Sequence, residues 1–225
     1  MYAATFHQEG KVVEKKVSPF RWLVIAVVIA YLIMLFGGGA LKPEYSHQSQ
    51  FISELNAAGT PYAQTIGWFG FVPFGFLVAM LIIVASHKAP VRGVSRVGYW
   101  LLMAEPVAYI GSAIWPCDIG CPIDGSTSQV IHNLLGLATY LTTTLGLFLL
   151  AFAPRLSLSW RLFWVMLSVV WVTLFALMVN DSIAEWRGLL QRLAEWIVYG
   201  SLCICAWRLA GTNNLLAPTT LRSAP

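Results

Sequence analysis

One short stretch, Ser126–Gly136, brings several side chains that can do chemistry into the start of a long apolar run. Ser128 precedes His132 by about one helical turn, so the two side chains would share a face of a helix. Asp118, in the preceding segment, is placed to orient the histidine in a Ser-His-Asp arrangement. The alternative is that His132 makes one structural hydrogen bond. Because ionisable groups within membrane spans default to a functional interpretation, both interpretations of His132 stay open, and the serine adds little because serine is common in such stretches.

A second interpretation of the same residues is a metal site. His47, Glu54, Asp118 and His132 together offer nitrogen and oxygen ligands of the kind found in metal-dependent hydrolases. The expected cofactor would be a divalent metal such as zinc. These residues are far apart in the sequence, so the hypothesis requires the segment around His47 to fold toward Asp118.

The last long apolar run carries a polar group of its own, formed by Gln191, Arg192 and Glu195. Glu195 is a further candidate for catalysis, and Arg192 is expected to anchor an anionic head group, with Gln191 and Asn133 contributing to substrate binding. The structural alternative is an ion pair between Arg192 and Glu195, which are three residues apart on a helix. Leaving either charge unpaired inside a bundle would be costly, so pairing is expected in both cases.

Cys117 and Cys121 are expected to lie in one loop. An oxidising compartment would favour a disulfide between them. Two thiolates could instead bind a metal. Cys203 and Cys205 lie in an apolar run and are interpreted as packing residues.

The elements that must position these residues are helices that cross a membrane. The chain of 225 residues is 58% hydrophobic and 11% charged, whereas soluble domains are nearer one quarter charged. Its apolar residues fall into runs close to the roughly 20 residues that a membrane-spanning helix needs. The sequence therefore predicts an all-α, polytopic membrane protein with six spans, at residues 19–38, 62–86, 96–115, 127–152, 160–179 and 184–209.

Local signals predict where three of these spans begin. Thr60 and Pro61 fit an N-cap followed by proline in the first turn. The segments Ser126–Gln129 and Ser182–Glu185 both fit the capping box, in which two side chains satisfy helix-end donors reciprocally. Between the first two spans, Ser46–Leu55 is predicted to form a short helix on the membrane surface.

The distribution of Lys and Arg predicts the orientation. Positive charge marks the cytoplasmic side, and most basic residues flank the two termini and the even-numbered connections. We therefore expect both termini in the cytoplasm, with a cytoplasmic segment at 1–18, a membrane domain at 19–210 and a disordered cytoplasmic tail at 211–225. The expected location is the inner membrane. The scattered basic residues do not form a patch for nucleic acid, so no such partner is expected. The residues assigned to the cytoplasmic side are Lys11, Lys15, Lys16, Arg21, Lys88, Arg92, Arg96, Arg155, Arg161, Arg208 and Arg222.

Four motifs resemble one family. Tyr45–Pro61, Pro116–Asp118, Ser126–His132 and Gln191–Glu195 are similar to segments of the bacterial and archaeal membrane family called domain of unknown function 998. The resemblance implies a six-helix protein similar to the eukaryotic Frag/DRAM/Sfk group, whose members are tied to lipid handling. It implies no reaction.

Together these observations predict a polar pocket that opens to the outer face and handles a membrane lipid or another amphiphile. A catalytic form would be a metal-assisted hydrolase or transferase at the outer leaflet. The alternative is a protein that binds lipid, senses it or serves as a scaffold, without catalysis. A small transporter, for which Glu105 within the third span is the supporting feature, is less favoured because no internal repeat is found.

Overall fold

The computed structural model describes residues 19–211. The predicted N-terminal segment at 1–18 lies outside the described residues, as does the predicted tail beyond Gly211. Within the described part every regular element is helical and there is no strand. Six helices are long and apolar enough to cross a membrane, which confirms the predicted fold class. These helices are Pro19–Ala40, Ala63–Ser86, Val94–Ile114, Thr127–Leu150, Leu158–Met178 and Asp181–Gly211.

Several spans are composed of more than one element. The elements in chain order are α1 (Pro19–Leu32), η1 (Ile33–Gly37), α2 (Gly38–Ala40), η2 (Ile52–Asn56), α3 (Ala63–Ile66), η3 (Gly67–Phe71), α4 (Val72–Ser86), α5 (Val94–Leu101), α6 (Ala104–Ile114), α7 (Thr127–Leu150), α8 (Leu158–Met178), η4 (Asp181–Trp186) and α9 (Arg187–Gly211). Each predicted span agrees with one of the six helices to within a few residues.

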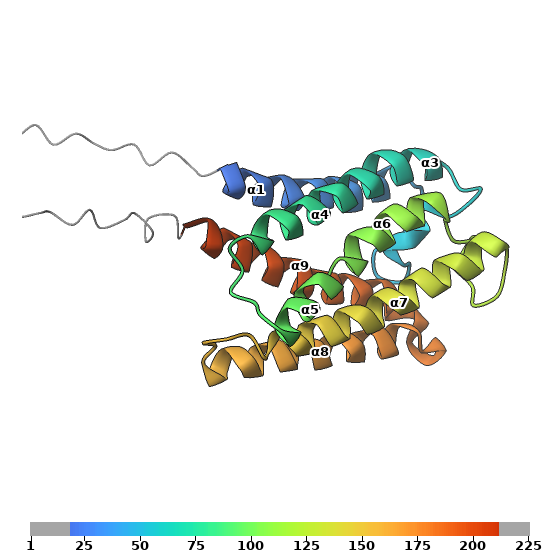
Figure 1. Ribbon diagram of the computed structural model, residues 1–225. Coiled ribbons are helices and arrows are strands. Elements are labelled where there is room, and N and C mark those ends of the chain that lie inside the picture. Colours follow the sequence, from blue (N-terminus) through green and yellow to red (C-terminus); the bar gives the residue numbers. More distant parts are fainter. Residues whose placement is uncertain (1–18, 212–225) are drawn as a thin grey trace, which may run out of the picture.

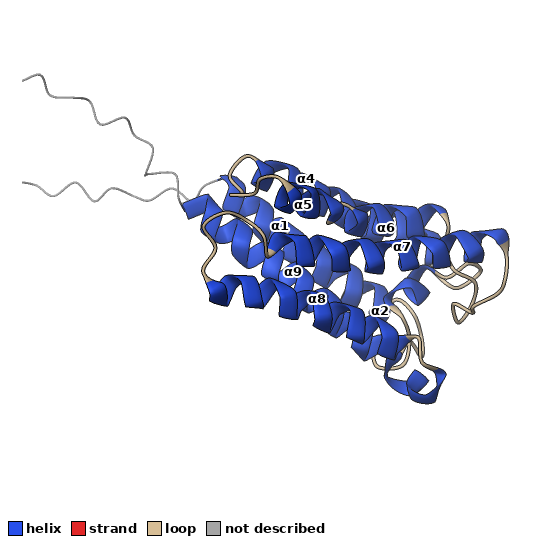
Figure 2. Ribbon diagram, turned by 60° about the horizontal axis from the view of Figure 1, so that its bottom comes forward, coloured by secondary structure: helices blue, strands red, loops and turns tan. Residues whose placement is uncertain are grey.

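The six spans form a ring. α1 packs against α4 and α9, α4 packs against α6, α6 against α7, α7 against α8, and α8 against α9. The described chain begins and ends at the same end of this bundle, as an even number of spans requires (Figures 1 and 2). We call the opposite end the loop end; it carries residues 41–62, 115–126 and 179–186. The cytoplasmic placement of the termini stays a prediction.

Prolines account for two irregularities in the spans. Proline has no N–H for the carbonyl four residues earlier and its ring clashes there. Pro106 stands just after the turn that separates α5 from α6, and Pro73 follows the π-helical segment η3. Such π segments often occur at functional sites. Phe71, at the end of η3, is buried and faces the interior of the ring.

Two of the predicted helix starts are wrong. The hydroxyl of Thr60 donates to the carbonyl of Ala57, 2.7 Å away, so it closes a turn rather than capping a helix. The helix begins instead at Ala63, after Tyr62 in the left-handed conformation. At the last span the capping side chain is Asn180, which accepts from the N–H of Ser182 at 3.0 Å. The Ser182–Glu185 pair therefore does not form the expected box.

The segment Ser46–Leu55 forms a turn followed by the 3₁₀ helix η2, not the predicted surface helix. Ile52 and Leu55 are buried inside the ring. This burial explains the difference. Burying them inserts the segment between the spans instead of laying it on the membrane.

Candidate functional site

The 3₁₀ helix η2 closes the loop end of the ring. The N–H of Ile52 donates to the side chain of Gln191 on α9 at 2.6 Å. Asn56 donates to the carbonyl of Ser112 on α6 at 2.6 Å. These contacts bridge opposite walls of the bundle. Gln191, predicted to bind substrate, therefore holds η2 in place.

Glu54, a predicted metal ligand, forms an ion pair with Arg187 at 3.2 Å. The Glu54 carboxylate also accepts from the side chain of Gln50 at 3.1 Å and from the N–H of Phe51 at 2.9 Å. The guanidinium of Arg187 lies over the ring of Phe51. With these partners, Glu54 ties the first connection to the start of α9.

Arg192 does not pair with Glu195, which corrects the expected ion pair. Its guanidinium donates to the carbonyl of Gln50 at 2.9 Å, to the carbonyl of Gly188 at 2.8 Å and to the hydroxyl of Tyr45 at 2.5 Å. Burial raises the pKa of Tyr45 to about 12, so this partner is a neutral hydroxyl at neutral pH. Arg192 thus binds the first connection from within, and the nitrogens that make these bonds face protein groups rather than an external head group.

Gly188 makes this contact possible. A Cβ at this position would collide with the backbone of Gln50. Only glycine therefore lets the start of α9 approach the first connection closely enough for Arg192 to reach the Gln50 carbonyl.

His47 lies in an aromatic surrounding. Its ring is 5.5 Å from that of Phe36 and 5.1 Å from that of Tyr45. Burial, and then the charge of Arg192, lower the pKa of His47. The buried Nδ1 has no hydrogen-bond partner in the described part of the chain.

The connection between α6 and α7 is fixed by side chains of α7. Gln129 accepts from the N–H of Asp118 at 2.7 Å and donates to the carbonyl of Pro122 at 2.6 Å. Asn133 donates to the carbonyls of Pro122 and Ile123 at 3.0 and 2.8 Å. Asn133, predicted to bind substrate, is thus a clamp on this loop.

The capping box at Ser126 is half formed. The Ser126 hydroxyl accepts from the N–H of Gln129 at 3.2 Å, as predicted. The reciprocal bond is absent from this helix end because the Gln129 side chain reaches the loop. The carboxylate of Asp118 takes its place and accepts from the N–H and hydroxyl of Ser126, both at 2.8 Å. These two bonds, the backbone one first, lower the pKa of Asp118.

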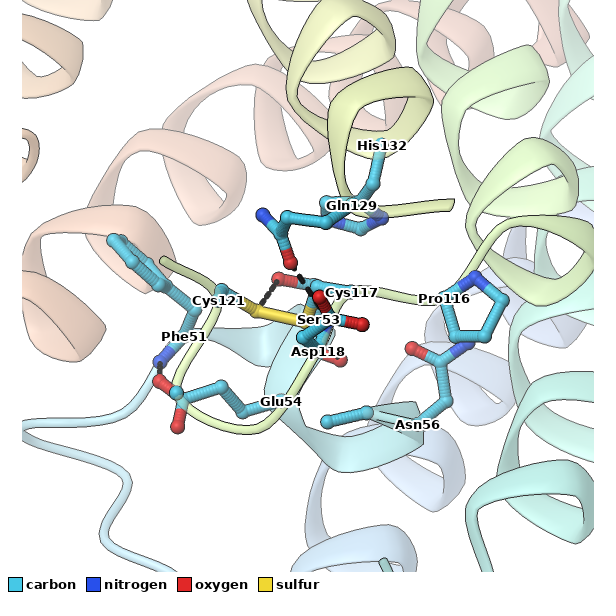
Figure 3. Close-up of a disulfide and its surroundings, with 12 residues drawn as sticks. Phe51, Ser53, Glu54, Asn56, Pro116, Cys117, Asp118, Cys121, Gln129 and His132 are labelled. Carbon is cyan, nitrogen blue, oxygen red and sulfur yellow. Dashed lines mark hydrogen bonds between the residues drawn. A yellow bond between two sulfur atoms is a disulfide. The ribbon is translucent and has the colours of Figure 1, made fainter. Parts of the chain in front are cut away.

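Cys117 and Cys121 form the predicted disulfide. It lies between η2 and the first turns of α7, beside Gln129 and His132 (Figure 3). The sulfur atoms of both cysteines and a ring nitrogen of His132 lie within 4.8 Å of one another. Because the sulfurs are bonded to each other, they are not available as thiolate ligands.

The structure does not assemble the predicted Ser-His-Asp arrangement. The hydroxyl of Ser128 donates to the carbonyl of Pro116 at 2.7 Å, and Nδ1 of His132 lies 3.1 Å from the carbonyl of Trp115. Asp118 is engaged with Ser126 instead. A carbonyl only accepts, so this contact requires the proton on Nδ1 of His132, which leaves Nε2 as an acceptor in the neutral ring.

The predicted metal set is not assembled either. Among residues 19–211, His47, Glu54, Asp118 and His132 do not bring three ligand atoms within 4.8 Å of one another. The physical reason is that each carboxylate is already satisfied: Glu54 by Arg187 and the backbone, and Asp118 by Ser126. The donor set of the structure therefore does not fit the expected zinc centre.

Two adjoining cavities lie beneath the loop end. The outer one has a volume of about 330 Å³ and lies between α7, α8 and η4. The inner one, of about 80 Å³, lies within the ring. Both are lined by Ser53, His132, Gly136, Tyr140 and Gln191, and we call the place where the two cavities adjoin at these residues the neck.

The floor of the inner cavity carries two acids, Glu105 of α6 and Glu195 of α9, which are 3% and 5% exposed. Tyr109 of α6 donates to Glu195, and Tyr199 of α9 donates to Glu105 at 3.0 Å. Each helix thus supplies one acid and the tyrosine that binds the acid of the other helix. Glu105 also accepts from Thr143 of α7 at 2.7 Å.

A repeated spacing of glutamate and tyrosine in the sequence indicates this arrangement, although the predicted site did not use it. Glu105 and Tyr109 are four residues apart, as are Glu195 and Tyr199, and both glutamates follow an alanine. On a helix this spacing places acid and tyrosine on one face. Because α6 and α9 run in opposite directions, the two pairs can meet reciprocally. Of the predicted catalytic residues, Glu195 and His132 line the inner cavity.

Comparison with known sequences supplies the family. A family model described as "Protein of unknown function (DUF998)" matches residues 24–208. The chain belongs to this family. The match covers all six spans of this DUF998 member, in agreement with the resemblance seen in its motifs. No curated protein and no solved structure matches the chain. The further link to the eukaryotic Frag/DRAM/Sfk group stays an expectation.

Proposed function

We propose that this DUF998 protein binds a lipid or another amphiphile, with the chain of the ligand in the outer cavity and its polar end directed through the neck into the inner cavity. The observation that carries the proposal is the shared lining of the two cavities, which places the apolar outer cavity directly beside the buried polar groups of the inner one. Pockets for small ligands combine apolar walls with a few polar groups in this way.

The outer cavity suits an alkyl chain. Its walls include Leu137 of α7 and Phe175 and Met178 of α8, and its rim carries Asn180 and Arg187. Its volume of about 330 Å³ lies at the lower end of the range for ligand pockets, roughly 300 to 1,000 Å³. One chain, or part of one, fits such a space.

Blocking the outer cavity tests the proposal. Leu137 lines the outer cavity, whereas Leu141, one turn later on α7 and similarly exposed, lines neither of the two cavities. We expect Leu137→Trp to weaken saturable binding of an eight-carbon alkyl amphiphile by about tenfold or more, which corresponds to about 1.4 kcal/mol. Leu141→Trp, the matched control, should bind like the wild type. Titration calorimetry of purified protein in a maltoside detergent measures both, with protein-free micelles as the blank.

Equal affinity of the two tryptophan variants, or uptake no greater than that of the micelles, would contradict the proposal. Unfolding temperatures of both variants show whether either substitution disturbs the bundle. Because both positions lie on the same helix and receive the same side chain, a difference between them reports the cavity rather than the bulk of tryptophan.

A catalytic form of this function is supported by one observation. His132 lines both cavities, and its Nδ1 contact with Trp115 directs the basic nitrogen away from that carbonyl. In this form Nε2 would act as a general base on a bound ester or on water. His132→Gln would then abolish turnover while leaving amphiphile binding within about twofold of wild type. Loss of binding together with a lower unfolding temperature would instead identify a structural histidine.

A further inference from the structure

The inner cavity presents acids without a basic partner. The ion pair between Arg187 and Glu54 is the one found within residues 19–211, and it lies at the loop end. The hydrogen bonds of Arg192 go to groups of the first connection and to the start of α9. Among the described residues, no Lys or Arg lines the inner cavity. Glu105 and Glu195 are therefore bonded by hydroxyl groups and lack a cationic side chain within the ion-pair distance.

The two acids differ in how far they are satisfied. Both oxygens of Glu105 accept a hydrogen bond, one from Thr143 and one from Tyr199. Glu195 accepts from Tyr109 on Oε2, whereas its Oε1 accepts no hydrogen bond from the described part of the chain. Glu195 is about 95% buried and lines the cavity. Because Glu195 lines the cavity, this oxygen is open to a ligand there.

A second polar group near Glu195 is also left open. The hydroxyl of Tyr31 on α1 lies beside the Glu195 carboxylate, near hydrogen-bond reach of it. It is buried, yet it makes no hydrogen bond of normal geometry within residues 19–211. Glu195 and Tyr31 therefore lie side by side without completing a hydrogen bond of normal geometry, whereas both oxygens of Glu105 accept one.

The walls around the acids are aromatic. Phe71, Tyr109, Tyr140 and Trp171 come from four different elements and all line the inner cavity. The rings of Tyr140 and Trp171 are stacked 4.6 Å apart, and the indole N–H of Trp171 donates to the carbonyl of Tyr140 at 3.1 Å. Aromatic faces attract cations, and most strongly where water is excluded.

The size of the inner cavity is also suitable. One water occupies roughly 10 to 15 Å³ of such a space, so a cavity of about 80 Å³ has room for roughly five to eight groups of that size. An ammonium group with one or two attached carbons fits this space. A ligand with a carboxylate or a phosphate group would instead be placed beside the two acids Glu105 and Glu195.

We infer that the inner cavity binds the ammonium group of a cationic amphiphile, with Glu195 as its counter-ion. This inference rests on the proposed function and names the class of ligand that the same site takes. The chain would lie in the outer cavity and pass the neck at Gly136, where the absence of a side chain leaves the path open. Glu105, fully hydrogen-bonded, would add to the negative potential of the floor.

The test compares three amphiphiles of equal chain length: octylammonium, 1-octanol and octyl phosphate. Each is titrated calorimetrically into the purified full chain in a maltoside detergent near neutral pH, with Leu137→Trp as the blocked reference. We expect wild type to bind octylammonium at least about tenfold more tightly than 1-octanol. Octyl phosphate should bind more weakly than either.

Glu195→Gln keeps an oxygen for Tyr109 but removes the charge, so we expect it to bind octylammonium and 1-octanol with equal affinity. The matched control is Glu185→Gln, which removes one exposed acid near the start of the same span and should keep the wild-type preference. If Glu195→Gln does not fold, the preference of wild type among the three probes still decides.

The outcomes separate the two proposals. If wild type binds all three probes equally and Leu137→Trp binds none, the ammonium site is wrong and the amphiphile pocket stands. Preference for octyl phosphate also overturns the ammonium site. If no probe binds wild type better than Leu137→Trp, the proposed function itself fails.

Discussion

The loop end and the inner cavity treat polar side chains in opposite ways. At the loop end, Gln129, Asn133 and Arg192 direct their hydrogen-bonding groups to backbone carbonyls and N–H groups of the connections. In the inner cavity, Glu105 and Glu195 accept only from hydroxyl groups of other helices, and one carboxylate oxygen accepts no hydrogen bond from the described chain. The first pattern builds structure, whereas the second leaves capacity for a ligand.

This difference leads to a stability rule. Removing Arg192 or Gln129 leaves part-buried or buried backbone groups unpaired, which costs roughly 1–3 kcal/mol for each group that water does not reach. Replacing an inner acid by its amide leaves the hydroxyl partners with a group that still accepts. Loop-end variants should therefore lose stability, and inner variants should lose binding.

Arg192→Met should have the largest effect on stability. It removes the charged donor from Gln50, Gly188 and Tyr45 within a buried site, and we expect the free energy of unfolding to fall by about 3–5 kcal/mol. Chemical unfolding in detergent measures the change. The control is Arg92→Met, at an exposed position at the other end of the bundle. A difference between the two variants below about 1 kcal/mol would refute the role given to Arg192.

Gln129→Leu should have the next effect, because it deprives the N–H of Asp118 and the carbonyl of Pro122 of their partner. We expect a loss of about 2 kcal/mol in the same unfolding assay. Gln64→Leu, on the exposed side of α3, supplies the comparison and should be close to neutral. Were both variants equally stable, Gln129 would not be the clamp of the loop.

Reduction of the disulfide should cost about 2 kcal/mol, because the loop that it closes is short. A reductant should thus lower the unfolding temperature of wild type and leave that of a Cys117→Ser, Cys121→Ser double variant unchanged. Cys205→Ser, at a free cysteine, should respond to reductant as wild type does. A wild type indifferent to reduction would show that Gln129 and Asn133 hold this loop without the bridge.

Asp118 should make a smaller, pH-dependent contribution to stability. Its pKa is lowered in the folded state by the N–H and hydroxyl of Ser126, so its contribution is present above the unfolded-state pKa and is lost as pH falls through the lower folded-state pKa. Acidification below about pH 4 should therefore reduce the unfolding temperature of wild type more than that of Asp118→Asn. Parallel pH profiles of the two proteins would argue against this contribution.

Glu105→Gln should have the smallest effect on stability. The amide keeps an acceptor for Tyr199 or Thr143 and replaces a buried acid that has no cationic partner in the described chain. We expect an unfolding free energy within about 0.5 kcal/mol of wild type, or above it. A loss of stability as large as that of Gln129→Leu would show that Glu105 stabilises the fold, as the loop-end residues do, and would argue against a role in ligand binding.

Much of the fold follows from the sequence because hydropathy alone determines which segments enter a membrane. The six spans are predictable on that basis, and the disulfide is predictable from two cysteines that share one connection. The polar residues within the apolar runs are also informative, because the stretch Ser126–Gly136 contains two of the neck residues, His132 and Gly136. What the sequence does not state is whether a polar side chain is bonded to a neighbouring loop or is left open.

Arg192 and Glu195 show this limit most clearly. Their spacing fits an ion pair. However, the close approach of Gly188 to Gln50 brings a backbone carbonyl within reach of Arg192. Glu195 instead accepts a hydrogen bond from Tyr109. Such an outcome depends on how distant segments meet. The repeated spacing of glutamate and tyrosine in α6 and α9 is visible in the sequence, but its meaning depends on the antiparallel packing of those two helices around one cavity.

The most direct test of the ligand site is an experimental structure of the protein with octylammonium bound. We expect the nitrogen of the ligand within about 3 Å of the open oxygen of Glu195, the usual distance of a charged hydrogen bond, with the alkyl chain beside Leu137 in the outer cavity. A ligand whose nitrogen lies among Asp118, Glu54 or Arg192 at the loop end, with the inner cavity filled by water, would contradict it.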